Sequence, residues 1–271
     1  MIVRFVKMHG AANDFVVVDA RGGGVPEPRG PWVARVCDRR RGVGADGVLL
    51  LEAHPALDFA MAYHNADGGR AEFCGNGARC AARFALDLGL GRGGEVAFAT
   101  DAGPKSARRA ADGRIALRFG RVEAGAPAAV VEAAGRAFEG RAFRPGVPHF
   151  VVEAASLAEV PLAAWGAALR HHPAFGPAGT NVDFVAPLGP SRVAMRTYER
   201  GVEGETPACG SGAIAVALWA AERGAASPVR VRTAGGDDLD VEFAEADGGW
   251  EVILTGPAEV AFRGEWREGP A

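Results

Sequence analysis

The chain has 271 residues, of which 48% are hydrophobic and 23% are charged, and its formal net charge is -3. This composition is typical of a globular protein and predicts no basic surface for nucleic acid. The longest apolar stretch, residues 213–221, is far too short to span a bilayer. Four cysteines in a chain of this length do not make a disulfide scaffold. We therefore expect reduced thiols and neither a nucleic-acid nor a membrane partner.

The first ten residues, MIVRFVKMHG, alternate apolar and polar side chains in the manner of a β-strand. They lack the apolar core of a signal peptide, so we expect a cytoplasmic location. Short β-rich runs separated by Gly and Pro follow along the chain. These runs are Val16–Asp19, Val48–Leu51, Val96–Ala99, Ile115–Phe119, Phe150–Val152, Val193–Tyr198, Val229–Arg232 and Val252–Leu254.

Residues 42–47 read GVGADG, which matches the letters of the dinucleotide-binding fingerprint. That motif needs a strand before it and a helix after it, because the phosphate binds at the helix N-terminus. Here the charged run DRRR precedes it and the strand-like run VLLLE follows. We therefore expect no nucleotide site.

Two segments of the chain resemble each other. CGNGARCAARFALDLG at 74–89 aligns without gaps with CGSGAIAVALWAAERG at 209–224. Each predicts a tight glycine turn that opens an amphipathic helix, with Asn76 and Ser211 as N-cap residues and glycines at the C-terminal stops. The matched cysteines, in a chain that has only four, indicate duplicated halves.

The predicted fold class is α/β, with two pseudo-symmetric lobes, each a curved, mostly antiparallel sheet or barrel around a central helix. We expect an N-terminal lobe at 1–118 that carries Cys74 and a C-terminal lobe at 119–261 that carries Cys209. A C-terminal tail at 262–271 is expected to return to the N-terminal lobe.

The paired cysteines suggest acid–base chemistry. A thiol just before a helix N-terminus feels the positive end of the helix dipole, which favours the thiolate. The same helix starts can bind a carboxylate through backbone N–H groups. If the halves face each other, one thiol can remove a proton from a carbon stereocentre while the other returns a proton to the opposite face. The competing interpretation is that both cysteines are small buried residues at tight turns. Cys37 and Cys80 fit that structural interpretation.

The segments HGAANDFVVVD, DRRRGVGADG, NADGGRAEFCGNGARC, GVPHF, HPAFGPAGTNVDFV and YERGVEGETPACGSGA together resemble, in order, the motif set of the diaminopimelate epimerase family. The resemblance runs from Met8 to about Trp219. It implies two pseudo-symmetric lobes, no pyridoxal phosphate or other cofactor, no metal, and interconversion of LL- and meso-diaminopimelate for lysine and cell-wall synthesis. It also implies a small-molecule amino-acid substrate and a homodimer.

Matched residue by residue, the resemblance assigns roles. Cys74 and Cys209 are the base and acid, and His149 and Glu199 position the two thiols. The reacting carboxylate is held by Gly75, Asn76, Gly210 and Ser211. The other substrate contacts are Asn13, Asn65, Asn181, Glu199 and Arg200. The remaining histidines that we assign to surface or packing are His54, His64, His171 and His172.

Three positions depart from the family pattern. Gly47 stands where many relatives have Gln, Gly69 where Ser is usual, and Val147 where a common motif has Asn. The changes at Gly47 and Val147 remove amides that can face the substrate, which affects recognition of its far amino-acid end. A racemase of another amino acid in the same superfamily is therefore an alternative. A PhzF-like isomerase is disfavoured because that branch lacks the two cysteines. A thiol redox protein would also use paired reactive cysteines, but would show no stereochemical activity.

Overall fold

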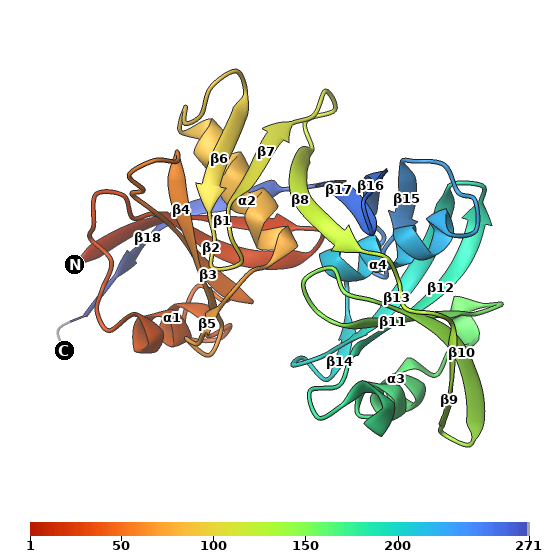
Figure 1. Cartoon of the computed structure of the whole chain (residues 1–271). Coiled ribbons are helices and arrows are strands. Elements are labelled where there is room, and N and C mark those ends of the chain that lie inside the picture. Colours follow the sequence, from red (N-terminus) through yellow and green to blue (C-terminus); the bar gives the residue numbers. More distant parts are fainter. Residues whose placement is uncertain (270–271) are drawn as a thin grey trace. The chain divides into compact units, whose positions relative to one another are not determined.

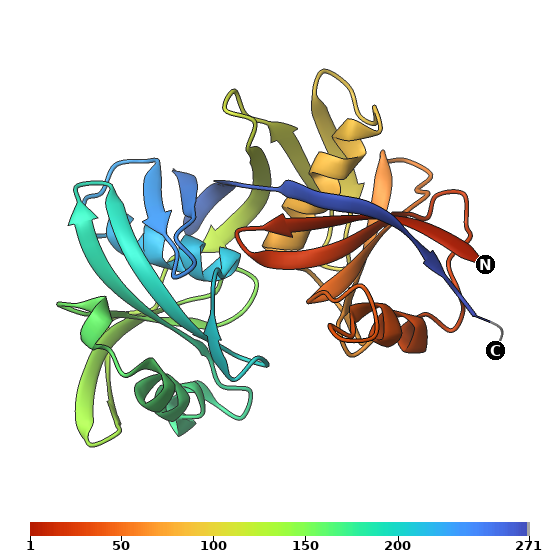
Figure 2. The ribbon, with the colours of Figure 1, turned by 180° about the vertical axis from the view of Figure 1, so that it is seen from behind.

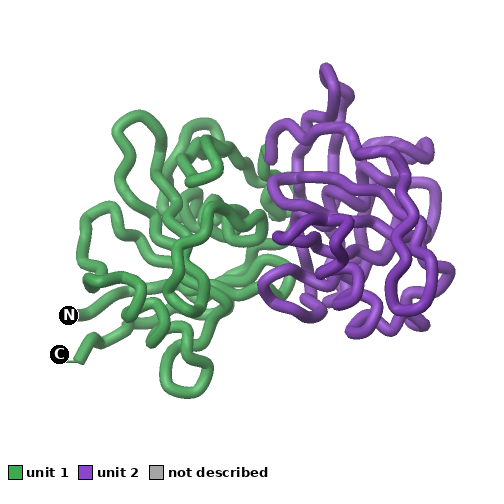
Figure 3. Tube along the Cα trace, turned by 60° about the horizontal axis from the view of Figure 1, so that its bottom comes forward, with its two compact units in different colours: residues 1–118, 256–271 green, residues 119–255 purple. Residues whose placement is uncertain are grey.

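The chain forms two compact units. The computed structural model describes residues 1–269. Unit 1 consists of Met1–Arg118 and Gly256–Ala271, and unit 2 consists of Phe119–Thr255 (Figure 3). Cys74 therefore lies in unit 1 and Cys209 in unit 2.

Unit 1 is built on one sheet with the strand order β18–β1–β2–β3–β4–β6–β7–β8. The pairs β2–β3 and β4–β6 are parallel and the others are antiparallel. Short β5 pairs with the end of β4. The strands are β1 (Ile2–Gly10), β2 (Asn13–Asp19), β3 (Gly47–Glu52), β4 (Phe59–Asn65), β5 (Arg70–Ala71), β6 (Glu95–Ala99), β7 (Lys105–Arg109), β8 (Ile115–Glu123) and β18 (Glu259–Arg267).

Two helices cover the faces of this sheet. Helix α2 (Gly75–Asp87) lies along one face (Figure 1). It packs there against side chains such as Phe15, Val17 and Leu49. Helix α1 (Arg29–Cys37) packs on the other face, against the alternating neighbours Val16 and Val48. Because successive strand residues point to opposite faces, both faces must be apolar, which explains the continuous runs VVV and VLLL.

Unit 2 repeats this arrangement. Its strand order is β9–β10–β11–β12–β13–β15–β16–β17, with β11–β12 and β13–β15 parallel and β14 beside β13. The strands are β9 (Ala129–Ala133), β10 (Arg136–Phe143), β11 (His149–Glu153), β12 (Asn181–Gly189), β13 (Arg192–Glu199), β14 (Gly204–Thr206), β15 (Val229–Arg232), β16 (Asp238–Ala246) and β17 (Gly249–Gly256). Helix α3 (Leu162–Arg170) follows β11 and helix α4 (Gly210–Ala221) follows β14, as α1 follows β2 and α2 follows β5. Two short 3-10 helices lie at Leu157–Glu159 and Pro173–Phe175.

The last strand of each repeat belongs to the other unit. Strand β9 follows β8 and pairs with β10, the first strand of the second repeat. Strand β18 follows β17 and pairs with β1, from Ile2 to His9 (Figure 2). Unit 1 therefore needs both ends of the chain.

The strand runs expected from the sequence are all confirmed, as are the α/β class and the fold with two similar halves. The expectation of an amphipathic second helix is wrong. Along α4, Gly210 and every residue from Gly212 to Ala220 are buried, because the helix is surrounded by its sheet. No helix within residues 1–269 is long and apolar enough to cross a membrane.

Candidate active site

A cysteine caps the N-terminus of each central helix. The Cys74 sulfur accepts a hydrogen bond from the Gly77 backbone N–H at 3.5 Å, and the Cys209 sulfur accepts one from Gly212 at 3.4 Å. Both cysteines have extended backbone angles, as N-cap residues do. The expectation that Asn76 and Ser211 are the N-caps is wrong. The cysteine sulfur accepts the hydrogen bond from the third helical residue, and Asn76 and Ser211 are the second residues of their helices, two positions after the caps.

In unit 1 the thiol of Cys74 faces an amide whose orientation is determined by its neighbours. The Cys74 sulfur lies 3.6 Å from Asn13 Oδ1, which also accepts a hydrogen bond from Asn76 Nδ2 at 3.2 Å. The other end of the Asn13 amide, Nδ2, donates to Asp46 Oδ2 at 2.7 Å. Because a carboxylate can only accept, Asp46 turns the oxygen of Asn13 toward Cys74.

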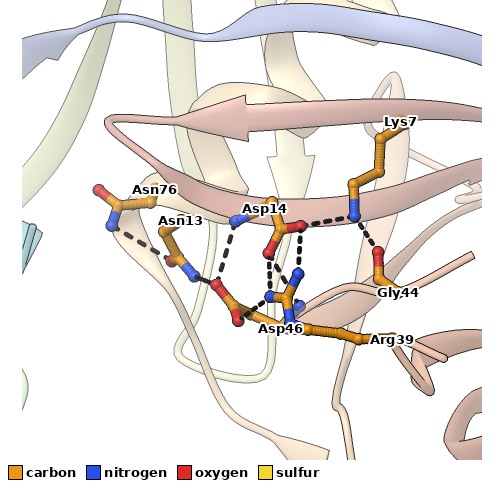
Figure 4. A network of polar contacts seen from close by, with 7 residues as sticks. All are labelled: Lys7, Asn13, Asp14, Arg39, Gly44, Asp46 and Asn76. Carbon is orange, nitrogen blue, oxygen red and sulfur yellow. Dashed lines mark hydrogen bonds and ion pairs between the residues drawn. The ribbon is translucent and has the colours of Figure 1, made fainter. Parts of the chain in front are cut away.

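A cluster of charges holds Asp46 in place (Figure 4). Arg39 donates to Asp46 Oδ1 and to Asp14 Oδ1, each at 2.7 Å. The buried ammonium of Lys7 lies 2.6 Å from Asp14 Oδ2 and also binds the Gly44 carbonyl. Burial raises the pKa of Asp14, but the hydrogen bonds from Arg39 and Lys7 outweigh it and bring the pKa well below its usual range. Asp14 is therefore a permanent anion near neutral pH.

The start of α2 is also tied to the strand that closes unit 1. Asn76 Oδ1 accepts a hydrogen bond from the fully buried Arg79 at 2.8 Å. Arg79 Nε in turn donates to the Pro257 carbonyl, just before β18. The side chain of Asn76 thus serves the protein itself.

In unit 2 a chain of polar groups leads from Cys209 into the interior. Ser211 Oγ lies 3.5 Å from the Cys209 sulfur and 2.9 Å from His149 Nε2. His149 Nδ1 lies 2.7 Å from Asp183 Oδ2, and both side chains are completely buried. Thr197 Oγ1 donates to the other oxygen of Asp183 at 2.7 Å. We call His149, Asp183 and Thr197 the polar trio.

The acidity of Cys209 differs from expectation. Burial raises the pKa of the Cys209 thiol well above its ordinary value, and the carboxylates of Glu199 and Asp183 raise it further. The hydrogen-bond contact with Ser211 and the hydrogen bond from the Gly212 backbone N–H lower this pKa, but they do not compensate for burial and the carboxylates. The backbone N–H at the start of α4 favours the thiolate of Cys209, as expected, but burial and the two carboxylates outweigh it, so the net shift favours the thiol.

The strand registers of the two units show which residues of unit 1 are equivalent to the polar trio of unit 2. Asp183 pairs with Thr197 across β12–β13, and the equivalent pair across β3–β4 is Leu49 with Tyr63. By the same register His149 corresponds to Phe15. Under the two matching helix starts, unit 2 thus buries a hydrogen-bonded trio where unit 1 has an apolar cluster of Phe15, Leu49 and Tyr63.

The other expected substrate contacts lie at strand ends. Asn65 ends β4 and is exposed. Asn181 starts β12 and is buried, and both ends of its amide bind the chain, Nδ2 at the Pro148 carbonyl and Oδ1 at the Arg200 N–H, each at 2.8 Å. Glu199 ends β13 and accepts a hydrogen bond from Thr206 at 2.7 Å. Arg200 is half-buried, and among residues 1–269 no carboxylate forms an ion pair with its guanidinium.

Of the three departures from the family pattern, the structure explains only Gly47. A Cβ at Gly47 would lie 2.4 Å from the His64 carbonyl oxygen and 2.7 Å from Tyr63 Cε2. No larger residue fits there with this backbone. Gly69 is exposed in the β4–β5 turn, and Val147 is half-buried in the turn before β11. Nothing in the structure explains these two.

The remaining cysteines and histidines are placed as follows. Cys37 and Cys80 are buried, and burial raises the pKa of each to about 12, so both behave as small apolar residues. His64 is buried and contacts the Gly68 carbonyl, while His171 is exposed beside Glu203. His54 and His172 accept hydrogen bonds from nearby backbone N–H groups.

Sequence analysis missed Asp183, Thr197 and Asp46. Asp183 carries a signal, since it is an acid within the otherwise apolar strand segment VDFV. Asp46 lies in the GVGADG segment, whose glycines drew attention to nucleotide binding instead. Thr197 carries no signal, because a threonine in a strand is ordinary.

The sequence matches known proteins over nearly its whole length. The sequence profile of diaminopimelate epimerase matches residues 5–127 and 142–261. The chain is 41% identical to the diaminopimelate epimerase of Desulforudis audaxviator, covering 97% of this chain and 99% of that one. It is 39% identical to that of Aquifex aeolicus, covering 98% of each.

Solved structures share the fold at low identity. A probable proline racemase from Agrobacterium radiobacter has a TM-score of 0.72 and 19% identity, covering 99% of this chain and 94% of that one. A PhzF-family protein from Bacillus anthracis has a TM-score of 0.73 and 13% identity, covering 99% and 100%. From the profile match and the similarity to these relatives over nearly its whole length, the chain belongs to the diaminopimelate epimerase family.

Proposed function

We propose that the protein inverts the α-carbon of LL-diaminopimelate to give the meso isomer, with Cys74 and Cys209 as the two proton-transfer groups. The observation that carries the proposal is the pair of matching helix starts, each capped by a cysteine sulfur. The relatives in Desulforudis and Aquifex carry this name, and they match nearly the whole chain.

Each helix start offers two chemical functions. The thiol can exchange a proton, and the backbone N–H groups at Gly75, Asn76, Gly210 and Ser211 can bind the reacting carboxylate. Removal of the α-proton leaves charge on that carboxylate, so the same N–H groups also stabilise the carbanion-like transition state. No residue of the proposed set requires a metal or a carbonyl cofactor.

The roles of the two thiols follow from their surroundings. Cys209 rests as a thiol because burial and nearby carboxylates raise its pKa, so it is the acid in one direction of the reaction. Cys74, beside the neutral Asn13 amide, is then the base in that direction. Glu199 lies on the Cys209 side, where its charge opposes loss of the proton.

Arg200 is our candidate for recognising the far carboxylate of the substrate. It is a half-buried guanidinium without an ion pair among the described residues, and a carboxylate ligand would supply one. Asn65 would add a polar contact. The chain itself occupies both ends of the Asn181 amide, so Asn181 would act on substrate mainly by positioning Arg200.

Isotope incorporation tests the two-thiol mechanism. In deuterium oxide the inverted product should carry deuterium at its α-carbon from the earliest turnovers, because the acidic thiol is loaded from solvent. Recovered starting isomer should stay protiated. Cys74→Ala and Cys209→Ala should each lose about 10²–10⁴-fold in kcat, whereas Cys37→Ala and Cys80→Ala serve as controls with active enzyme. Early product that is mostly protiated would exclude the mechanism.

The same assay separates the alternatives. A racemase of another amino acid would prefer a different substrate in a panel of L-amino acids. If the site is built for diaminopimelate, a shorter amino acid leaves polar groups of the site unpaired. Each such group should cost about 1–3 kcal/mol of binding free energy. A thiol redox protein would show no inversion with any of them.

Assembly and location are further parts of the proposal. The family resemblance supports a homodimer, and the biosynthetic role of the relatives' reaction supports a cytoplasmic location. Light scattering of the purified protein measures the first, and cell fractionation the second.

A further inference from the structure

The polar trio packs under the start of α4. The start of α4 has a counterpart in unit 1, the start of α2, but the polar trio has none. His149 and Asp183 are fully buried, and each oxygen of Asp183 accepts one hydrogen bond, from His149 and from Thr197. A buried charged network costs desolvation, and unit 1 reaches the same fold with apolar residues at these positions. The fold therefore does not require the trio.

The hydrogen bonds determine how His149 presents its ring. The carboxylate of Asp183 can only accept, so His149 Nδ1 must carry a proton. In a neutral imidazole Nε2 is then unprotonated and accepts from Ser211 Oγ, 2.9 Å away. The Ser211 oxygen can in turn accept the proton of the Cys209 thiol at 3.5 Å.

We propose that Asp183 and Thr197 are positioning residues, which hold His149 so that it takes up the Cys209 proton through the hydroxyl of Ser211. This inference rests on the proposed function, since it explains how Cys209 becomes a thiolate for the direction in which it is the base.

The proton transfer balances within the chain. The Cys209 S–H bond breaks as that proton binds Ser211 Oγ, and the original Ser211 O–H bond breaks as its proton binds His149 Nε2. The products are a thiolate, an unchanged serine and an imidazolium. The imidazolium lies against the Asp183 carboxylate, which stabilises its charge.

Because Thr197 holds one oxygen of Asp183, the Asp183→Asn variant is a specific test of how His149 is positioned. In Asp183→Asn we expect the Thr197 hydroxyl to keep donating to the side-chain oxygen, as it does to Asp183, so that the NH2 group faces His149 Nδ1. That donor forces Nδ1 to accept and moves the ring proton to Nε2, which can then no longer accept from Ser211. The effect is the one that an Asp-to-Asn change produces in a serine-protease triad.

Nitrogen-15 NMR of His149 measures the tautomer directly in the ligand-free protein. We expect the neutral Nδ1–H form in the unaltered chain and the Nε2–H form in Asp183→Asn. In the same variant kcat should fall by about 10²-fold or more, with KM changed little. The matched control is Asp240→Asn, which alters another buried carboxylate of unit 2, and it should leave the His149 signals and kcat unchanged.

A double variant distinguishes positioning from general disruption. In Asp183→Asn with Thr197→Val the amide is free to turn its oxygen toward His149, so the Nδ1–H form and part of the activity should return. A double variant with lower kcat than the single one, or an imidazolium or Nε2–H form in the unaltered protein, would overturn the proposal. A flipped tautomer with unchanged kcat would exclude the Ser211 path. If no amino acid is inverted at all, the proposed function fails, while the NMR arm still tests the trio.

Discussion

At the scale of single residues, the two thiols have the same backbone setting and different electrostatic surroundings. Cys74 faces an amide oriented by the Lys7, Asp14, Arg39 and Asp46 cluster, in which hydrogen bonds keep the pKa of Asp14 well below its usual range (Figure 4). Cys209 lies next to a histidine chain that can accept a proton. These different surroundings of Cys74 and Cys209 suit a reaction in which one thiol is protonated and the other is deprotonated at the start.

Asp14 should contribute stability that depends on pH. Its pKa is lowered in the folded state, so its contribution is complete above the ordinary value of 3.8 and is lost as pH falls through the lowered value. We expect Asp14→Asn to reduce the free energy of unfolding by about 1–3 kcal/mol near neutral pH. Urea denaturation of both proteins should show this difference shrinking in acid.

The control is Asp101→Asn, which removes the exposed ion pair with Arg70 and should cost less than about 1 kcal/mol. If the Asp14→Asn difference were the same in acid as at neutral pH, the carboxylate would not be responsible for it.

At the scale of elements, α2 and α4 begin alike and pack on different partners. A Cβ on Gly77 would lie 3.1 Å from the flexible end of Leu49, whereas one on Gly212 would lie 2.6 Å from Asp183 Oδ1 and 3.3 Å from Thr197 Oγ1. Glycine is therefore needed at the start of α4 for close approach to the polar trio, and less strictly at the start of α2.

A pair of matched substitutions follows from this asymmetry. Alanine favours a helix over glycine by up to about 1 kcal/mol, and Leu49 can shift by a few tenths of an ångström. We therefore expect Gly77→Ala to change the free energy of unfolding by less than about 1 kcal/mol. Gly212→Ala should lose about 1–3 kcal/mol, because it displaces a hydrogen-bonded carboxylate. Chemical denaturation compares the two, and equal losses would contradict the packing argument.

At the scale of the whole molecule, the exchange of last strands makes unit 1 depend on distant parts of the chain. Strand β18 covers the edge of β1, and Pro257 just before it binds the buried Arg79 of α2. Without this segment β1 would be an unpaired edge and Arg79 would lose an acceptor.

A chain that ends at Gly256 should therefore lose the structure of unit 1. Hydrogen exchange should show β1 and α2 unprotected while β15 and β16 in unit 2 keep their protection. A synthetic peptide of residues 257–271 should restore protection in unit 1. The control chain ends at Glu268, keeps all of β18, and should behave as the full chain does. Native protection of β1 in the chain ending at Gly256 would refute the dependence.

The sequence by itself determined the strand runs, the two helix starts with their cysteines, and the family. These features depend on near neighbours along the chain: strand runs on successive residues, and a cap on a residue and the third one after it. The tertiary structure decided the rest. Asp183 meets Thr197 and His149 only through strand pairing, and Asp46 meets Asn13 across two strands. The sequence could not give the pKa of Cys209, because the direction of its shift depends on how much water and which carboxylates surround the sulfur once the helix is enclosed by its sheet.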